Sequence, residues 1–444
     1  MKKLFAVLLA VAMMLSLACS AMAEAPAAIP EGRRVITFWH SMSGGNLDAL
    51  NEIVADFNNS QDEIWVDASY QGAYDECLTK LKSAFTADSA PDVFMMFELG
   101  ANYLANSGYV IPFQDRFDED PFMDLNDIVD VLRNYYTING KLQCFPFNPS
   151  SELMYYNVDA FEAAGVEVPT TLAGIADVAD ALVATGMVKY ALAMPIYGWT
   201  FENFVAGMGG YYLNNENGRG GVATELEYTE SGIGAEIMKV WKDLVDKGYA
   251  FNYGTSNANA RSGFMAGDCA LVIYSTASLR TIQNGSNFRV GAHYLPVMTE
   301  GAATAVLIGG ANLWMYKSGD QQRQDDAWKF VRFYAENVEE TAKFSKASGY
   351  FAVRKSAFEL DSYAAYLEEN PAAKVAVQQL LDSPISLVTA GANTGCMTEL
   401  RQIWQNTFAK YLGNELSLEE AMDEMRLLSN EALEYYNEVN GLVD

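Results

Sequence analysis

Catalytic signatures are mostly absent from this 444-residue sequence. Neither of its two histidines, His40 and His293, lies near another metal ligand type along the chain, so a metal site is not expected. The motifs GxSxG, HExxH and GxxxxGK[ST] are absent, and no cofactor is predicted. The 57 acidic residues are too many for any one pair to indicate catalysis, so a secreted hydrolase remains only a remote alternative.

The cysteines form no catalytic or metal-binding pattern either. Cys77, Cys144, Cys269 and Cys396 are far apart and include no CxxC pair. Because a metal or redox site needs closer spacing, we predict buried free thiols. One disulfide stays open as an alternative in an oxidising compartment.

Short segments that combine glycine, aromatic and polar residues are more informative. Ligands of α/β proteins bind at the ends of strands, where such residues can lie close to a small molecule. The segments of this kind are Gly72–Tyr74, Phe97–Gly100, Phe147–Ser151, Gly198–Trp199, Ser275–Thr276, Gly309–Gly310 and Ser348–Tyr350. By contrast, Gly-Arg-Gly-Gly at residues 218–221 is interpreted as a surface turn.

The elements that must position these segments begin as alternating strands and helices. Residues 35–39 are β-rich, residues 64–70 alternate as a strand, and residues 92–97 form an apolar run typical of a buried parallel strand. Apolar residues at helical spacing lie between them, over residues 47–57 and 78–85. Strands that alternate with helices predict an α/β layered domain.

The rest of the chain continues this pattern and ends in helices. Residues 270–274 predict an apolar strand that leads into the Ser275–Thr276 pair, a natural helix N-cap. Residues 307–310 and 313–316 predict two strands around a glycine step, and Ser417–Glu420 has the form of a capping box in a helical tail. No low-complexity linker is visible, as expected where the chain crosses repeatedly between two lobes.

The N-terminal sequence predicts export. A basic start is followed by the apolar run 4–18 and by Ala21–Ala23, the layout of a signal peptide that occupies residues 1–23. The run is shorter than the roughly 20 residues that span a bilayer. Lipid anchoring through Cys19 stays open, although Ser16–Cys19 is a poor lipobox. We therefore expect a periplasmic or extracellular protein, released or anchored.

The formal net charge of −28 restricts the partners. Nucleic acids and anionic membranes bind basic surfaces, so neither is expected as a partner. An anionic ligand would need a local cluster of donors, because the overall charge opposes its approach. Salt screens that opposition beyond about 10 Å.

Four ordered stretches resemble the family 1 extracellular solute-binding proteins of ABC importers, especially the members that bind glycerol-3-phosphate. The similarity runs from about Val35 to the helical tail, which is nearly the whole chain without its leader. The stretches are Phe38–Met42, Pro146–Asn148 followed by Tyr155–Asn157, Ile308–Ala311 with Leu313–Trp314, and Gly349–Tyr350.

The resemblance implies a two-lobed α/β fold of the periplasmic-binding-protein type, with crossover segments and a helical C-terminal tail. It also implies that a small molecule is held between the lobes, that the lobes close by a hinge, and that ABC permease subunits receive the ligand. We expect a monomer without enzymatic activity. The expected lobes are residues 33–146 with about 305–350, and residues 147–304 with about 351–440.

The resemblance further implies ligand contacts, carried over one position at a time. Glu98 would accept hydrogen bonds from glycerol hydroxyls, and Trp199 would pack on the carbon skeleton. Arg401 would fork onto a phosphate, and Ser275 with Thr276 would offer hydroxyl and N–H groups at a helix N-terminus. The remaining contacts are Tyr74, Ser150, Gly310 with its accessible backbone N–H, and Tyr350 on the phosphate.

Because of its departures from the family pattern, the sequence is compatible with more than one class of ligand. The basic residue that members often have shortly before the arginine is missing from Ala392–Gly395, and Pro149 and Glu152 replace residues near the hinge. We therefore expect glycerol-3-phosphate or a glycerophosphodiester, with a neutral sugar or oligosaccharide as the alternative. Without the resemblance, Arg401 would be expected to pair with Glu399 or another surface acid.

Overall fold

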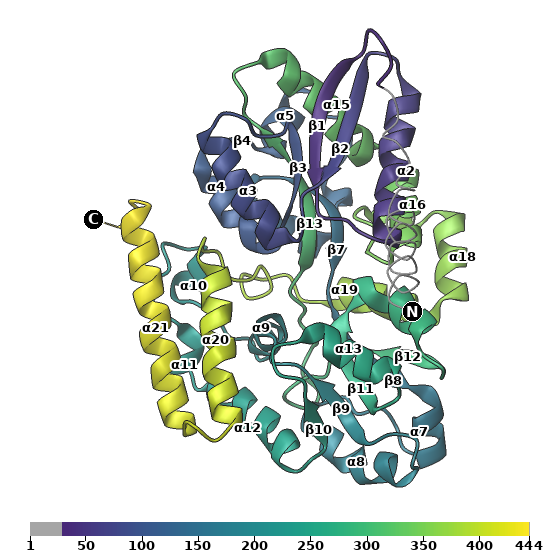
Figure 1. Ribbon diagram of the computed structural model, residues 1–444, viewed down its shortest axis with the longest axis vertical. Coiled ribbons are helices and arrows are strands. Elements are labelled where there is room, and N and C mark those ends of the chain that lie inside the picture. The colour runs from purple at the N-terminus through teal and green to yellow at the C-terminus, as the bar shows by residue number, and fades with distance from the viewer. Residues whose placement is uncertain (1–28, 444) are drawn as a thin grey trace, which may run out of the picture.

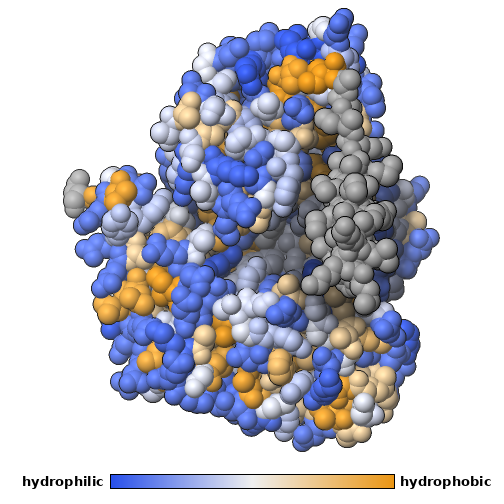
Figure 2. Space-filling model, in the orientation of Figure 1, coloured by the Kyte–Doolittle hydropathy of each residue, from blue (hydrophilic) through white to orange (hydrophobic). Residues whose placement is uncertain are grey.

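The computed structural model describes residues 29–443, so the predicted signal peptide and Cys19 lie outside the described residues. Two sheets with surrounding helices form two lobes, one above the other in Figure 1, which confirms the predicted two-lobed α/β fold. Between residues 29 and 443, no helix combines the length and apolarity that crossing a bilayer requires. The face shown in Figure 2 is largely hydrophilic, in keeping with the net charge.

The first lobe is built on a sheet with the strand order β2-β1-β3-β13-β4, and β7 also pairs with β13. β1, β2 and β3 are parallel, whereas β13 runs antiparallel to β3, β4 and β7. The strands are β1 (Arg34–His40), β2 (Ile64–Tyr70), β3 (Val93–Phe97), β4 (Val110–Ile111), β7 (Phe145–Ser150) and β13 (Gly309–Tyr316). Every residue of β3 is buried, as its apolar run predicts.

Helices and a small hairpin complete the first lobe. A 3₁₀ turn at Glu98–Gly100 directly follows β3. The hairpin joins β5 (Thr137–Ile138) to β6 (Lys141–Leu142). The helices are α2 (Gly45–Ser60), α3 (Tyr74–Thr86), α4 (Ala101–Ser107), α5 (Phe113–Glu119), α6 (Asp130–Tyr136), α15 (Gln321–Glu336) and α16 (Val338–Ser348).

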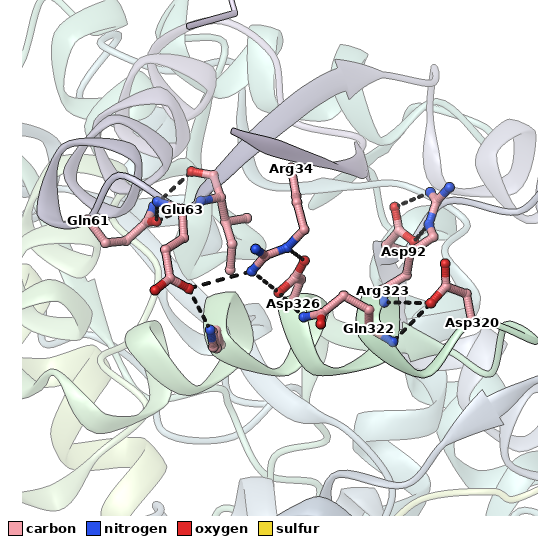
Figure 3. A network of polar contacts seen from close by, with 10 residues as sticks. Arg34, Gln61, Glu63, Asp92, Asp320, Gln322, Arg323 and Asp326 are labelled. Atoms are coloured by element: carbon pink, nitrogen blue, oxygen red, sulfur yellow. Dashed lines mark hydrogen bonds and ion pairs between the residues drawn. The ribbon is translucent and has the colours of Figure 1, made fainter. Parts of the chain in front are cut away.

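Ion pairs fasten α15 to the first sheet (Figure 3). Arg34, the first residue of β1, forks onto the buried carboxylate of Asp326 in α15, with N–O distances of 2.7 and 2.9 Å. Arg323, also in α15, forks onto Asp92 just before β3, with both distances at 2.6 Å. These bidentate pairs hold the helix that follows β13 against β1 and β3.

The second lobe is built on a mixed sheet with the order β10-β9-β11-β8-β12. The strands are β8 (Glu152–Asn157), β9 (Tyr190–Met194), β10 (Ala250–Asn252), β11 (Cys269–Ser275) and β12 (Val290–His293). The helices are α7 (Val158–Ala164), α8 (Ile175–Ala184), α9 (Gly198–Gly207), α10 (Asn214–Gly218), α11 (Glu227–Glu230), α12 (Ile233–Asp246), α13 (Asn257–Met265), α14 (Leu279–Gly285), α19 (Pro371–Asp382), α20 (Met397–Leu412) and α21 (Leu418–Val439).

The chain passes between the lobes at three places. β7 leads into β8 through Ser151, and β12 leads back to β13. The third passage joins α17 (Lys355–Phe358) and α18 (Asp361–Glu369), which pack on α16, to α19, which packs on β12. β7 therefore stays in the first sheet as far as Ser150, past the expected boundary at residue 146, and α17 and α18 lie with α16.

One local prediction was wrong and another is confirmed. A single strand, β13, runs from Gly309 to Tyr316, with a register shift against β7 between Ala311 and Asn312, where two strands were expected. The reason is that its first residues pair with the distant strand β7 and so continue the ladder. The capping box is present, because Ser417 Oγ accepts the N–H of Glu420 and the Glu420 carboxylate accepts the N–H of Ser417 at the start of α21.

Candidate functional site

Arg401 lies at the centre of a buried ion cluster between the lobes. From α20 in the second lobe, its Nε and Nη2 donate to the two carboxylate oxygens of Glu202 on α9, at 2.5 and 2.9 Å. Its Nη1 donates to Oε1 of Glu98 in the first lobe, at 3.2 Å. Glu98 and Glu202 are only 8% and 5% exposed. The partners of Arg401 are thus two buried acids, one from each lobe, rather than neighbouring Glu399.

Burial and the neighbouring charges have opposite effects on the pKa values of this cluster. Burial raises the pKa of Glu98, and the charge of Arg401 offsets only part of that effect. Burial by itself would lower the pKa of Arg401, but the Glu202 and Glu98 carboxylates outweigh it and raise that pKa. One guanidinium thus faces two carboxyl groups, and the cluster is net negative when both are ionised. A phosphate that bound Arg401 would compete with Glu202 for the fork.

A third buried acid, Glu152, lies at the first crossover. Its Oε1 accepts a hydrogen bond from Thr200 Oγ1 at 2.6 Å, and its Oε2 accepts one from Asn203 Nδ2 at 3.4 Å. Burial raises the pKa of Glu152 to about 8, although the Thr200 hydrogen bond and the charge of Arg401 act in the opposite direction. Glu152 is therefore mainly protonated at neutral pH and adds little negative charge there.

Two glycines let bulky side chains lie close to the backbone around the cluster. A Cβ on Gly198 would lie 2.9 Å from Cγ of Arg401, and a Cβ on Gly309 would lie 2.7 Å from the ring of Trp199. The indole of Trp199 is buried, and its Nε1 has no hydrogen-bond partner among the described residues. Because an unpaired buried donor is unfavourable, an acceptor on a ligand that reached this N–H would be favourable.

Two tyrosines of the first lobe meet at Asn148 on β7. Asn148 Nδ2 donates to the hydroxyl of Tyr74 at 3.0 Å, and the Tyr74 ring stacks on Phe97 with centroids 5.2 Å apart. Burial raises the pKa of Tyr350, while hydrogen bonding to Asn148 and Tyr74 acts the other way. The charge of Glu98 adds to the rise in pKa of both phenols, which places them near the ion cluster.

The hydroxyl pair at the end of β11 is engaged within the protein. Ser275 Oγ accepts the N–H of Ala277 at 3.3 Å and caps a 3₁₀ turn before α14. Thr276 Oγ1 accepts the N–H of Ser151 at 3.2 Å, and the Thr276 N–H donates to the Ser151 carbonyl at 2.9 Å. These contacts fix β11 to the crossover, so N–H groups expected for a phosphate already have partners.

Ser150 and Gly310 lie on the paired strands β7 and β13. Ser150 is buried and pairs with Gly309. Gly310 has φ of 94°, and a Cβ there would lie 2.0 Å from the carbonyl oxygen of Asn148. The sheet itself therefore requires glycine at position 310, whatever a ligand requires.

Glu202 is the site residue that the sequence reasoning missed. The structure brings Glu98 and Arg401 into contact and places Trp199 on the helix of Glu202, but the fork of Arg401 lies on Glu202. A signal was present, because the segment Gly198–Gly207 is mostly apolar and Glu202 is its one charged residue. A carboxylate in such a helix needs a buried partner.

The four described cysteines take no part in the cluster. Cys77, Cys144, Cys269 and Cys396 are buried free thiols. Burial raises the pKa of Cys77 to about 11 and that of Cys269 to about 12, which disfavours the reactive thiolate. Within residues 29–443, no group of three or more His, Cys, Asp or Glu side chains is placed to hold a metal ion.

Comparisons with known proteins agree with this architecture. A family described as bacterial extracellular solute-binding protein matches residues 52–374. The sn-glycerol-3-phosphate-binding periplasmic protein UgpB of Escherichia coli K12 is 30% identical over 421 residues, which cover 93% of this chain and 94% of UgpB. UgpB of Salmonella typhimurium is 30% identical over 423 residues, with the same coverage of both chains.

Solved structures share the fold. UgpB from Mycobacterium tuberculosis in complex with glycerophosphocholine is similar with a TM-score of 0.76 and 25% identity, over 90% of this chain and 98% of that one. The sugar-binding protein MalE from Xanthomonas citri is similar in fold, with a TM-score of 0.77 and 20% identity over 93% of this chain and 100% of that one.

Proposed function

Because this chain belongs to the bacterial extracellular solute-binding proteins and is the substrate-binding component of an ABC importer, we propose that it captures glycerol-3-phosphate or a glycerophosphodiester between its lobes. The observation that carries the proposal is Arg401, which is buried on the second lobe and reaches Glu98 of the first lobe at 3.2 Å. A phosphate held by this arginine would touch both lobes and favour their closure.

Side chains near Arg401 provide the remaining ligand contacts. Glu98 accepts hydrogen bonds from glycerol hydroxyls, and the unpaired indole N–H of Trp199 donates to a ligand oxygen. Tyr74 and Tyr350 provide hydroxyls close to Glu98. The residues that hold the surrounding strands and the crossover in place are Ser150, Ser275, Thr276 and Gly310.

Calorimetry with glycerol-3-phosphate and with glycerol tests the proposal. We expect binding of the phosphate compound and no measurable binding of glycerol at the same concentration. Arg401→Ala removes a charge-assisted contact and should weaken phosphate binding by about 1.5–3 kcal/mol. Arg426→Ala on α21 is the matched control, because Arg426 is solvent-accessible and its partners among the described residues are surface acids. Unchanged phosphate affinity in Arg401→Ala would refute the proposal.

A neutral sugar or oligosaccharide is the second candidate, and the Arg401–Glu202 pair favours it. Carboxylates fixed by an arginine are good acceptors for sugar hydroxyls, and this mode of binding needs no open guanidinium. In the same calorimeter, binding of maltose without binding of glycerol-3-phosphate would select this candidate.

We further propose that the protein is exported, acts as a monomer without converting its ligand, and binds no nucleic acid. The two lobes would close on the ligand about the three chain passages, and permease subunits would receive the closed form. N-terminal sequencing of the exported protein tests the leader, since a start at Glu24 indicates cleavage after Ala23 and a modified Cys19 indicates a lipid anchor.

A further inference from the structure

A large pocket adjoins the Arg401 cluster. It encloses about 510 Å³ between α4 and the β5–β6 hairpin of the first lobe and, on the other side, residues 218–223, the loop before α20 and the end of α21. Figure 1 shows α4, α10 and the C-terminal end of α21 around this region. A smaller pocket, lined by Glu98, shares Asn102, Arg219 and Asn393 with the large one. The large pocket therefore lies next to the proposed phosphate position.

The lining of the large pocket differs chemically from the rest of the protein. Although the chain has a net charge of −28, none of the described residues that line this pocket is acidic, and only one, Arg219, is basic. Amide side chains both donate and accept hydrogen bonds, which suits a group with many hydroxyls. The asparagines that line the pocket are Asn102, Asn106, Asn134, Asn139, Asn393 and Asn437.

Arg219 lines both pockets. The Gly-Arg-Gly-Gly turn lies at the surface as predicted, but the Arg219 side chain is half-buried and bonded to backbone carbonyls of both lobes. Its Nε donates to Gly391 at 2.9 Å, and its Nη2 donates to Tyr135 at 3.2 Å and to Ala390. Its Nη1 donates to Thr137 at 3.4 Å, and the guanidinium lies 5.5 Å from the centre of the Tyr135 ring.

No described carboxylate neutralises the positive charge of Arg219. All its hydrogen-bond acceptors are carbonyls, and none of its ion-pair distances to a described carboxylate is within 4.0 Å. Burial lowers its pKa to about 10, so the group stays protonated at neutral pH. Of the five guanidinium N–H groups, one on Nη1 is still available to a ligand. Arg219 thus brings a basic group next to Ala392–Gly395, which has none.

We propose that this pocket is a second subsite that binds a hydroxyl-rich head group on the far side of the ligand phosphate, in contact with Arg219. The inference rests on the proposed function, because it identifies the ligand as a glycerophosphodiester with a polyol head group. A cationic head group finds no carboxylate in this lining and meets the positive charge of Arg219 instead.

Three ligands that share the glycerol phosphate unit test this assignment by calorimetry. They are glycerol-3-phosphate without a head group, glycerophosphoglycerol with a polyol head group and glycerophosphocholine with a cationic one. We expect glycerophosphoglycerol to bind at least about tenfold more tightly than the other two, since it gains several hydrogen bonds. Arg219→Gln should reduce that advantage about tenfold and leave glycerol-3-phosphate within about twofold.

Two further variants distinguish a loss of ligand binding from a disruption of the contacts that Arg219 makes with both lobes. Asn106→Ala removes an exposed amide of the pocket without touching Arg219, and it should weaken glycerophosphoglycerol about threefold. Arg426→Gln has the same charge change as Arg219→Gln on the solvent side of α21 and should change nothing. Equal losses for all three ligands in Arg219→Gln, or no preference for glycerophosphoglycerol in the unaltered protein, would overturn the subsite. Failure of every phosphate ligand to bind the unaltered protein would instead refute the proposed function, and the subsite with it.

Discussion

Replacing Glu202 by glutamine tests whether this carboxylate and a ligand phosphate compete for Arg401. The amide keeps the shape of the side chain and can still accept a hydrogen bond, but it loses the charge. A phosphate bound to Arg401 would lie within a few ångströms of the Glu202 oxygens, because these already contact Nε and Nη2 at 2.5 and 2.9 Å. Two like unit charges about 5 Å apart repel by about 3 kcal/mol at an effective dielectric constant of about 20.

The expected effect is a gain in affinity for the phosphate ligand. Protonation of Glu98 and local rearrangement will absorb part of the repulsion, so we expect at least about 1.4 kcal/mol, or tenfold tighter binding of glycerol-3-phosphate. A neutral sugar should bind no more tightly, since it has no charge to repel. Titration calorimetry at low salt is the assay, because salt weakens the charge effect.

The control is Glu399→Gln, which has the same charge change at an exposed position two residues before Arg401. It should leave both affinities unchanged. Thermal melting must show that Glu202→Gln is folded, because breaking a buried ion pair can destabilise by about 3–5 kcal/mol. If the folded variant binds glycerol-3-phosphate more weakly, Glu202 positions Arg401 for the phosphate and the competition argument is wrong.

Two stability measurements examine the surroundings of the site. The pKa of Glu152 is about 8 in the folded protein and near 4.5 in the unfolded chain. Between these pH values the unfolded chain releases the proton and the folded protein keeps it, so this group lowers the stability of the fold as pH rises. Glu152→Gln should remove that loss of stability, which amounts to at most about 1.4 kcal/mol per pH unit. Equal slopes of melting temperature against pH in the variant and the unaltered protein would contradict this. Gly310→Ala should destabilise by at least about 1–3 kcal/mol, because φ is 94° and the Cβ would clash with the Asn148 carbonyl. Gly45→Ala, where a Cβ has open space, is the control, and a similar melting temperature for both variants would refute the clash.

Structural features that depend on residues close together in the sequence could be predicted. The apolar run of β3 and the capping box at Ser417 are local patterns, and both occur as expected. The continuity of β13 could not be predicted in this way, because Gly309 and Gly310 gain their partners from β7, far away in the chain. A glycine pair read alone resembles a turn.

The same distinction applies to the candidate site. The resemblance indicated the residue types at Glu98 and Arg401, but the partners of Arg401 come from segments 199 and 303 residues away. Only the tertiary fold shows that its fork is occupied. The basic group near Ala392–Gly395 likewise comes from Arg219, which no local pattern connects with that stretch.

An acidic protein can accept an anion here only if the local charges balance. Arg401 offsets only one of the Glu98 and Glu202 carboxylates when both acids are ionised, so a phosphate would then add to an uncompensated negative charge. Burial raises the pKa values of Glu98 and Glu152, and a phosphate nearby would raise them further. Protonation of a carboxyl on binding would reduce the excess negative charge and turn an acceptor into a donor for a phosphate oxygen. Glu98 and Glu152 are therefore compatible with a phosphate ligand, whereas permanently ionised acids at these two positions would oppose its binding.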